Sequence, residues 1–324
     1  MILAGDIGGT KTALAWVDAG AVVATRTVPS AGFASLAEIV RAFLAMDTAC
    51  VARAACFGIA GPIVGDIVRT TNLPWVIDRR ELSALLGTPR VRLINDLEAV
   101  AHGVGVLGDD ELVTLNPGRS DRSGNAAVIA AGTGLGEAGL YWDGAVHHPF
   151  ATEGGHASFA PRNELEIGLL RFLLAEHQDV SWERVLSGPG LHGIYRYLRD
   201  GLRAGEPEWL TDRLRDGDPA AIVAGAALDG SSPVCRRALD LFVTLYGAEA
   251  GNLALKTLAT GGVFVAGGIA PKILPALTGG NFLRAFVRHG RFRPVLEAIP
   301  VQVVVSDAVA LRGAARAAVL DDGA

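Results

Sequence analysis

Cysteine is scarce in this chain, which has only Cys50, Cys56 and Cys235 among its 324 residues. Their number is odd, and no two of them have the close spacing of a zinc-binding or redox motif. We therefore expect three reduced, mostly buried thiols. This scarcity argues against a disulfide-stapled secreted fold and against a cysteine-based metal site.

A long hydrophobic run and an excess of basic charge are also missing. The mean hydropathy is +0.34, but glycine and charged residues interrupt every apolar run before the roughly 18 residues that a membrane-spanning helix needs. Asp6 comes after only a few residues, so the N-terminus does not match a secretory leader. The net charge of −5 provides no basic surface for DNA or RNA. We expect a cytoplasmic protein with no nucleic-acid partner and no membrane partner.

Glycine, in contrast, is abundant, and two glycine-rich turns follow one pattern. The segment GDIGGT occupies residues 5–10, and AAGTGLG occupies residues 130–136. Each lies between two short apolar runs, which predicts a strand, a glycine turn and a second strand. Such turns bring backbone N–H groups close to an anion, so the two together are suited to clamp a polyphosphate. For either turn alone, an ordinary hairpin is the alternative.

Length and composition predict two domains of α/β architecture. A chain of 324 residues with 50% hydrophobic content can bury a large core and exceeds the usual size of one domain. We expect residues 1–107 plus 301–324 to form a small α/β domain, and residues 108–300 to form a larger, more helical one. An alanine-rich helix expected at 308–320 would return to pack on the first domain.

Asn95 and Asp96 follow a short apolar strand expected at residues 91–94, where a helix begins. Ligand sites in open α/β sheets tend to lie at this end of the strands. Phosphoryl transfer to an alcohol needs a carboxylate that accepts the hydroxyl proton, and Asp96 fits that role. The alternative is that Asp96 only caps the helix.

A second group of polar residues lies in EGGH, at residues 153–156. The two glycines allow the backbone to bring Glu153 and His156 toward one small polar ligand, and a sugar offers adjacent hydroxyls of this kind. A metal site is the rival interpretation, but the motif supplies too few ligands. Glu183, in SWERVLSGPG, is expected on a short helix that ends at Gly188-Pro189. Alone it reads as a solvated helix charge, and it gains interest only in combination with EGGH.

Taken together, these motifs resemble those of a known family, the bacterial ATP-dependent glucokinases of the sugar kinase and actin-like superfamily. The motifs that occur here in the family's order are GDIGGT, INDLEAVA, AAGTGLG, EGGHASFAP, ERVLSGPGL, GNLALKTLATGGVFVAGGI and GRF. The resemblance covers nearly the whole chain. It implies an α/β, two-domain actin-like (ribonuclease H-like) sugar kinase fold with an inter-domain cleft. It also implies ATP-dependent phosphorylation of glucose to glucose 6-phosphate.

The resemblance also implies roles for particular residues. Asp96 would be the catalytic base, and the residues that bind glucose hydroxyls would be Asn95, Glu153, His156 and Glu183. The residues that bind ATP would be Gly5, Asp6, Ile7, Gly8, Gly9 and Thr10 in the first phosphate loop, Thr133 and Gly134 in the second, and Gly267 and Gly268 on the adenosine side. Asp6 would orient Mg²⁺ through water. The resemblance further implies a homodimer.

Two other functions remain open. The first is a kinase for another hexose, such as fructose, mannose or an amino sugar. The second is a non-catalytic, sugar-sensing regulator with an actin-like fold. We expect no DNA-binding segment before the first strand, which counts against this regulator. The chain also lacks the cysteine-rich zinc motif that is usual in the related repressor and sugar kinase family. Asn72 is a candidate for the edge of the sugar pocket, with a plain loop role as the alternative.

Overall fold

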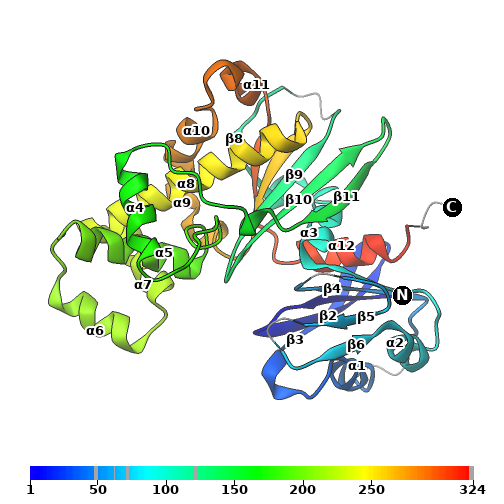
Figure 1. Ribbon diagram of the computed structural model, residues 1–324. Helices are drawn as coiled ribbons and strands as arrows, with labels where there is room; N and C mark the ends of the chain where they lie inside the picture. Colours follow the sequence, from blue (N-terminus) through cyan, green and yellow to red (C-terminus); the bar gives the residue numbers. More distant parts are fainter. Residues whose placement is uncertain (47–49, 62, 71–72, 120–122, 321–324) are drawn as a thin grey trace. The chain divides into compact units, whose positions relative to one another are not determined.

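The computed structural model describes residues 1–46, 50–61, 63–70, 73–119 and 123–320. The chain divides into two compact units (Figure 1). Unit 1 contains residues 1–111, 148–151 and 306–324, and unit 2 contains residues 112–147 and 152–305. The domain limits expected from the sequence differ from these boundaries, chiefly at 301–305, and they remain a prediction.

Unit 1 is built on a five-stranded sheet with the strand order β3-β2-β1-β4-β7. The strands and helices of the unit are β1 (Ile2–Ile7), β2 (Lys11–Asp18), β3 (Ala21–Pro29), α1 (Leu36–Leu44), β4 (Ala54–Ile59), β5 (Ile67–Arg69), β6 (Val76–Asp78), α2 (Arg79–Leu86), β7 (Val91–Asn95), α3 (Asp96–Val104) and α12 (Val309–Ala317). The central strands β1, β4 and β7 are parallel, so their carboxyl ends lie along one edge.

The helices α3 and α12 pack closely against each other and against β1 and β4 (Figure 1). Glycines at the contact permit this approach: a Cβ on Gly313 would collide with the Ala99 carbonyl oxygen, and one on Gly103 would collide with that of Val309. The alanine-rich helix expected after the last strand is therefore α12, which packs within unit 1. A larger side chain at either glycine would push the two helices apart.

Unit 2 is larger and contains a six-stranded sheet with the order β11-β10-β9-β12-β13-β8. The sheet includes β11 (His147–Thr152), although residues 148–151 are grouped with unit 1. The other strands and helices are β8 (Leu112–Asn116), β9 (Ala126–Ala131), β10 (Leu135–Trp142), α4 (Glu164–Leu174), α5 (Gly188–Arg196), α6 (Glu208–Asp216), α7 (Pro219–Leu228), α8 (Pro233–Thr257), β12 (Gly262–Ala266), α9 (Leu274–Thr278), α10 (Asn281–Phe286), α11 (Arg293–Glu297) and β13 (Val301–Val304). Because β13 hydrogen-bonds to β12 and β8, residues 301–304 belong to this sheet.

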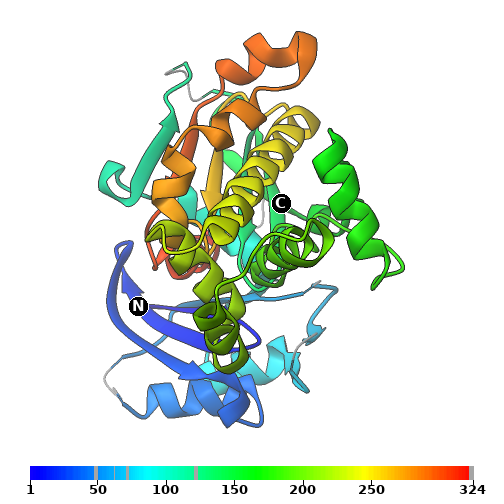
Figure 2. The same cartoon turned by 90° about the vertical axis from the view of Figure 1, so that its left-hand side faces the viewer.

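The long helix α8 is the centre of the helical layer in unit 2 (Figure 2). Sixteen of its 25 residues are buried, and it contacts β9, β12, α5, α7 and α10. Apolar side chains from all of these elements form one continuous core. Burial of apolar surface on this scale is the main stabilising term for the unit.

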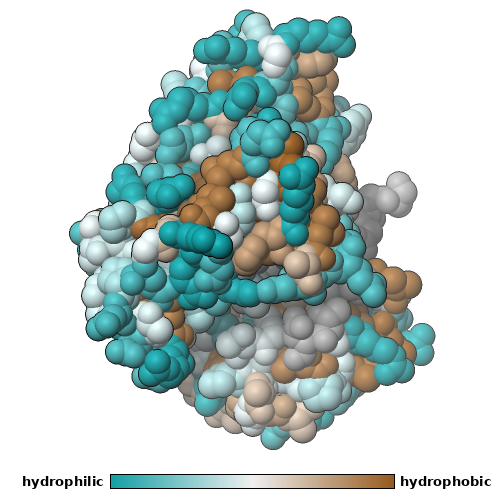
Figure 3. Space-filling view, turned by 60° about the vertical axis from the view of Figure 1, so that its left-hand side comes forward, coloured by the Kyte–Doolittle hydropathy of each residue, from teal (hydrophilic) through white to brown (hydrophobic). Residues whose placement is uncertain are grey.

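Hydrophilic and hydrophobic residues are mixed on the surface. In the view of Figure 3, hydrophilic residues (teal) are spread over the visible face, with hydrophobic residues (brown) between them. Among the residues that the structure describes, no helix has the length and apolarity needed to cross a membrane.

Candidate active site

The first glycine turn connects β1 to β2 at one edge of the sheet in unit 1. The Gly8 amide donates to the carbonyl oxygen of Lys11 at 3.0 Å, which closes the turn. Ile7, Ile59 and Asn95 are in register across β1, β4 and β7. Since neighbouring strands lie about 4.8 Å apart, the ends of β1 and β7 are about 10 Å apart. The sheet thus brings the first turn and Asn95-Asp96 to the same edge.

A buried serine braces this turn. The Ser30 hydroxyl lies 2.8 Å from the Gly8 carbonyl oxygen, to which it donates, and 2.9 Å from the Thr12 hydroxyl. The Ser30 amide donates to the carbonyl oxygen of Thr10 at 3.0 Å. Ser30 and Thr12 are both fully buried. Three hydrogen bonds from one residue therefore fix the backbone of residues 8–12.

Asn95, rather than Asp96, is the N-cap of α3. Its Oδ1 accepts from the amides of Leu97 and Glu98, at 2.9 and 3.4 Å, and its Nδ2 donates to the Gly61 carbonyl oxygen at 3.1 Å. Asp96 is the first helical residue, and its Oδ1 also accepts from the Leu97 amide at 2.9 Å. Because Asn95 performs the capping, the helix does not depend on Asp96 for its cap.

Asp6 lies near the end of β1, beside the first turn. Burial raises the pKa of its carboxyl group, and the positive charge of Lys11 opposes that shift. A carboxylate that is short of solvent gains from a nearby cation, so Asp6 is suited to face Mg²⁺. Mg²⁺ usually keeps several waters and takes only one or two protein carboxylates together with substrate phosphates. The absence of any three-ligand His/Cys/Asp/Glu cluster from the described residues is compatible with that mode of binding.

The second glycine turn connects β9 to β10 in unit 2, where the Gly132 amide donates to the Gly134 carbonyl oxygen at 2.8 Å. The Leu135 amide, directly after the turn, donates to Oε2 of Glu183 at 3.0 Å. A Cβ on Gly134 would collide with that same carboxylate. Glu183, which we expected only on the sugar side, is therefore packed against the second phosphate turn.

The prediction that Glu183 lies on a helix ending at Gly188-Pro189 is wrong. Residues 182–186 form turns, and Gly188 and Pro189 begin α5 instead. Ser187 is the N-cap, with its hydroxyl accepting from the Gly190 amide at 3.1 Å, and a proline in the first turn of a helix is favourable. The segment is held by hydrogen bonds from the Glu183 amide to the Gly155 carbonyl oxygen and from the Trp182 amide to that of Ala157.

The EGGH segment forms a short 3-10 turn over Gly154–His156. The side chains of Glu153 and His156 are 64% and 62% exposed, and Oε2 of Glu153 lies 3.9 Å from Nε2 of His156. Both groups are thus adjacent and accessible to a ligand. Because the Glu183 amide bonds to Gly155, unit 2 places the three predicted sugar-binding residues Glu153, His156 and Glu183 on two connected segments.

Gly267 and Gly268 follow β12, next to β9 in the sheet. Gly267 has a positive φ of 85°, and a Cβ there would collide with the Ala131 carbonyl oxygen. The Ile269 amide donates to that same carbonyl at 3.2 Å. The loop predicted on the adenosine side therefore lies directly beside the strand that leads into the second phosphate turn.

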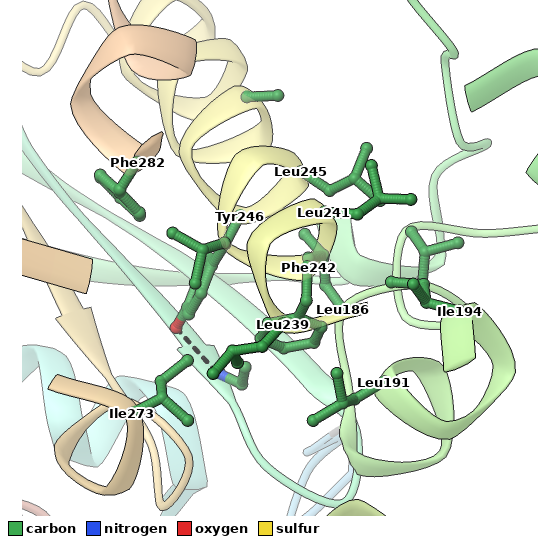
Figure 4. Packing of buried hydrophobic residues seen from close by; sticks show 14 of the residues in the cluster. Leu186, Leu191, Ile194, Leu239, Leu241, Phe242, Leu245, Tyr246, Ile273 and Phe282 are labelled. Atoms are coloured by element: carbon green, nitrogen blue, oxygen red, sulfur yellow. Dashed lines mark hydrogen bonds between the residues drawn. The ribbon is translucent and has the colours of Figure 1, made fainter. Parts of the chain in front are cut away.

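Tyr246 of α8 joins these two strand ends. Its hydroxyl accepts from the Ala131 amide at 3.1 Å and faces the carbonyl oxygens of Ile129 and Ala266, at 3.3 and 3.2 Å. Figure 4 shows the tyrosine within the apolar core, with its hydroxyl directed away from α8 along the dashed hydrogen bond. The ring is fully buried, and burial raises the pKa of the phenol, so it remains a neutral O–H group.

Sequence reasoning missed three residues that support the turns, namely Ser30, Tyr246 and Glu137. Ser30 and Tyr246 have no local sequence signal, because their partners are distant in the chain. Glu137 had a signal: it is an acidic residue inside an apolar strand, and it is 1% exposed. The candidate Asn72 lies outside the described residues.

Comparison with known proteins decides the family. The profile described as "Glucokinase" matches residues 3–320. The chain belongs to the glucokinase family. A glucokinase of Nostoc punctiforme is 43% identical over 333 residues, which cover 97% of this chain and 98% of the relative.

Solved structures of the glucokinase family agree with this membership. A glucokinase from an Antarctic psychrotroph has a TM-score of 0.84 at 33% identity and covers 98% of both chains. The glucokinase of Balamuthia mandrillaris, solved in complex with glucose, has a TM-score of 0.81 at 25% identity and covers 98% of this chain and 93% of its own. The expected α/β, two-domain actin-like sugar kinase fold is confirmed.

Proposed function

We propose that this chain transfers the γ-phosphoryl group of ATP to the 6-hydroxyl of glucose, giving glucose 6-phosphate and ADP. The observation that carries the proposal is the glucokinase family match over residues 3–320. The relative from Balamuthia mandrillaris, solved with glucose, supports the choice of sugar. Neither a kinase for another hexose nor a non-catalytic sugar sensor is favoured by these matches.

In this proposal, unit 1 supplies the base and unit 2 supplies most of the sugar contacts. Asp96 accepts the proton of the 6-hydroxyl as that oxygen attacks the γ-phosphorus. Asn95 can donate to a sugar hydroxyl through the second hydrogen of its Nδ2, because Gly61 uses only one. Glu153, His156 and Glu183 bind the other hydroxyls and hold the sugar in place for attack.

The backbone of the two turns binds the phosphates. Residues 5–10, with the Thr10 hydroxyl, hold them from one side, and Thr133 and Gly134 hold them from the other. Gly267 and Gly268 lie against the adenosine, where a side chain would obstruct the ligand. Asp6 would hold Mg²⁺ through water, and the ion would supply positive charge against the phosphates. Closure over the sugar excludes water, which would otherwise compete as acceptor.

A coupled ADP-release assay tests this function on glucose, mannose, fructose, 2-deoxyglucose and an amino sugar, with and without Mg²⁺. We expect magnesium-dependent turnover that is fastest on glucose. In the Glu153→Gln variant, kcat/KM for glucose should fall about 5- to 150-fold, because a buried sugar hydroxyl loses its charged acceptor. This fall corresponds to a loss of about 1 to 3 kcal/mol in transition-state stabilisation.

The sugar panel also separates the rival functions. The Glu153→Gln loss should be smaller for a sugar that lacks or inverts the hydroxyl concerned. An equal loss on every sugar would show that Glu153 only supports its loop. No turnover on any hexose would favour the sensor, and faster turnover on fructose or an amino sugar would replace glucose as the substrate.

The proposal also covers the localisation and the oligomeric state of the enzyme. We place the enzyme in the cytoplasm, where ATP is abundant and where its three cysteines, which form no disulfide in the structure, would stay reduced. We also propose a homodimer, which rests on the resemblance to bacterial glucokinases. Size-exclusion chromatography with light scattering gives the mass directly, and a monomer mass near 33.6 kDa would exclude the dimer.

A further inference from the structure

Beneath the EGGH turn of unit 2 lies a buried pair of carboxyl groups, Glu137 of β10 and Glu249 of α8. They are 1% and 0% exposed, and their side chains are within hydrogen-bonding contact. The negative charge of Glu249 is already paired with Lys256, whose Nζ donates to Oε1 at 3.0 Å. Asn252 Nδ2 donates to the other oxygen, Oε2, at 2.6 Å. Because Lys256 already balances the charge of Glu249, it cannot also balance a negative charge on Glu137.

One carboxyl oxygen of Glu137 has no donor among the described residues. Its Oε1 is buried, and no N–H or O–H group of the described residues bonds to it. A carboxyl group can hydrogen-bond to a carboxylate only if one of the two carries a proton. The pair thus fits a neutral Glu137 whose O–H group donates a hydrogen bond to the Glu249 carboxylate. Burial, followed by the charge of Glu249, raises the pKa of Glu137 from 4.5 to about 8, and Lys256 opposes the shift.

The side chain of Glu137 is also in close contact with the predicted sugar loop at Gly154. A Cβ on Gly154 would collide with Oε2 of Glu137, so the loop backbone rests on this carboxyl group. The Thr152 hydroxyl donates to the Glu137 carbonyl oxygen at 2.9 Å and accepts from the Gly154 amide at 3.2 Å. A displacement of the Glu137 side chain would therefore move Gly154, which lies next to Glu153.

We propose that Glu137 is a positioning residue for glucose, and that its protonated form holds the 153–156 loop in the sugar-binding conformation. Loss of that proton would place two negative charges in contact inside the protein and displace the loop. This inference rests on the proposed function, because it assumes that the loop binds the sugar.

The titratable groups on the elements that pack around Glu137 come from α8, from the loop and from β11, the other neighbour of β10, which begins with His147 and His148. α8 contributes Glu249, Lys256 and the buried Tyr246, whose pKa is raised and which stays neutral. The loop contributes Glu153 and His156, which are mostly exposed. The residues of β9 opposite Glu137 are apolar. A transition near pH 8 that disappears with the Glu137 carboxyl would therefore be assigned to this group.

The experiment compares wild type with Glu137→Gln, which keeps the size and a hydrogen-bond donor but cannot ionise. Both KM for glucose and kcat are measured from pH 6 to 9.5 at saturating ATP. In wild type we expect KM for glucose to rise and kcat/KM to fall about fivefold between pH 8 and 9, with kcat changing less. In Glu137→Gln this fall should be absent, with near wild-type activity at pH 7. Glu176→Gln, an exposed glutamate elsewhere in unit 2, should keep the wild-type profile.

A second variant and a binding measurement guard against trivial outcomes. Lys256→Met removes the charge that lowers the pKa of Glu137, so the fall should move to higher pH. Calorimetric titration with glucose at pH 7 and 9.5 should show weaker binding at high pH in wild type only. An unchanged profile in Glu137→Gln, a shift to lower pH in Lys256→Met, or pH-independent glucose binding by wild type would each overturn the inference. The proposed function fails separately, if wild type turns over no hexose at any pH.

Stability supplies a readout that does not depend on catalysis. Since the folded pKa of Glu137 lies above 4.5, the folded protein binds a proton that the unfolded chain releases. The stability contribution of this group is present at low pH and is lost as the pH rises from 4.5 to about 8. Glu137→Gln should therefore raise Tm relative to wild type at pH 9, and the difference should shrink toward pH 5. The opposite trend would show that Glu137 is ionised in the folded protein.

Discussion

The two glycine turns are similar in sequence but are held in place by different groups. The first, at Gly8 to Thr10, is braced by the neutral hydroxyl of Ser30 within the sheet of unit 1. The second, at Gly132 to Gly134, is followed by an amide that donates to the Glu183 carboxylate, a predicted sugar ligand. Two copies of one sequence motif can therefore have different hydrogen-bond partners in the folded protein. The first turn is held by Ser30, whereas the second shares the Glu183 side chain with the predicted sugar-binding residues of unit 2.

This difference implies a division of work between the units. In unit 1 the predicted phosphate turn and the proposed base Asp96 lie at one sheet edge, and among the described residues no predicted sugar carboxylate hydrogen-bonds to the turn. In unit 2 Glu183 links the second glycine turn, through the Leu135 amide, to Gly155 of the predicted sugar loop. Substitutions in the two units should therefore separate catalysis, ATP binding and glucose binding in different ways.

The largest effect should come from Asp96→Asn in unit 1. The amide keeps the shape and one acceptor but cannot take the proton of the attacking hydroxyl, so kcat should fall about a hundredfold or more. Asn95 still caps α3, so Tm should change little. Glucose affinity, measured by calorimetry, should also remain close to wild type. Nearly normal turnover in the folded variant would reduce Asp96 to a structural residue.

An intermediate effect is expected from Gly134→Ala in unit 2. The new methyl group would displace the Glu183 carboxylate, which then loses the Leu135 amide. We expect KM to rise about tenfold for ATP and for glucose alike, because one side chain serves both sites.

Gly132→Ala is the matched control in the same turn. A Cβ at Gly132 meets no atom within 4 Å, so Glu183 keeps its place. Only the approach of phosphate should suffer, and KM for ATP should rise without a change in KM for glucose. If Gly134→Ala gave the same ATP-only pattern as Gly132→Ala, the second turn would be as independent of the sugar residues as the first.

The contrast also shows where sequence reasoning succeeds and where it stops. Both hairpins and the strand end at Asn95 follow from local patterns, namely apolar runs, glycines and a capping residue, so they were predicted. The helix start at Ser187 was also readable, since a serine before Gly-Pro is a start signal. The sequence pattern places a helix at residues 182–186 instead, and that assignment turns the same Gly-Pro into a predicted helix end.

The supporting contacts depend on tertiary packing. Ser30 is 22 residues from Gly8, and Tyr246 is 115 residues from Ala131. No period or spacing within the chain indicates such partners. The bond between Glu183 and Leu135 is of the same kind, because two segments 48 residues apart must first fold together. The roles of the site residues toward glucose and ATP remain predictions, which the substitutions above address.

The smallest effects should come from removing the one buried hydroxyl that braces each turn. Ser30→Ala leaves the Gly8 carbonyl oxygen without its donor, and Tyr246→Phe leaves the Ala131 amide without its acceptor. An unpaired buried group costs about 1 to 3 kcal/mol, so each variant should lower the free energy of unfolding by that amount. KM for ATP should rise only a few-fold in both, because each turn keeps its own backbone hydrogen bond. KM for glucose should stay unchanged in Ser30→Ala but rise slightly in Tyr246→Phe, because strand β9 leads into the turn that contacts Glu183. Chemical denaturation and steady-state kinetics on the same preparations give both quantities. Equal glucose effects in the two variants would remove the distinction between the turns.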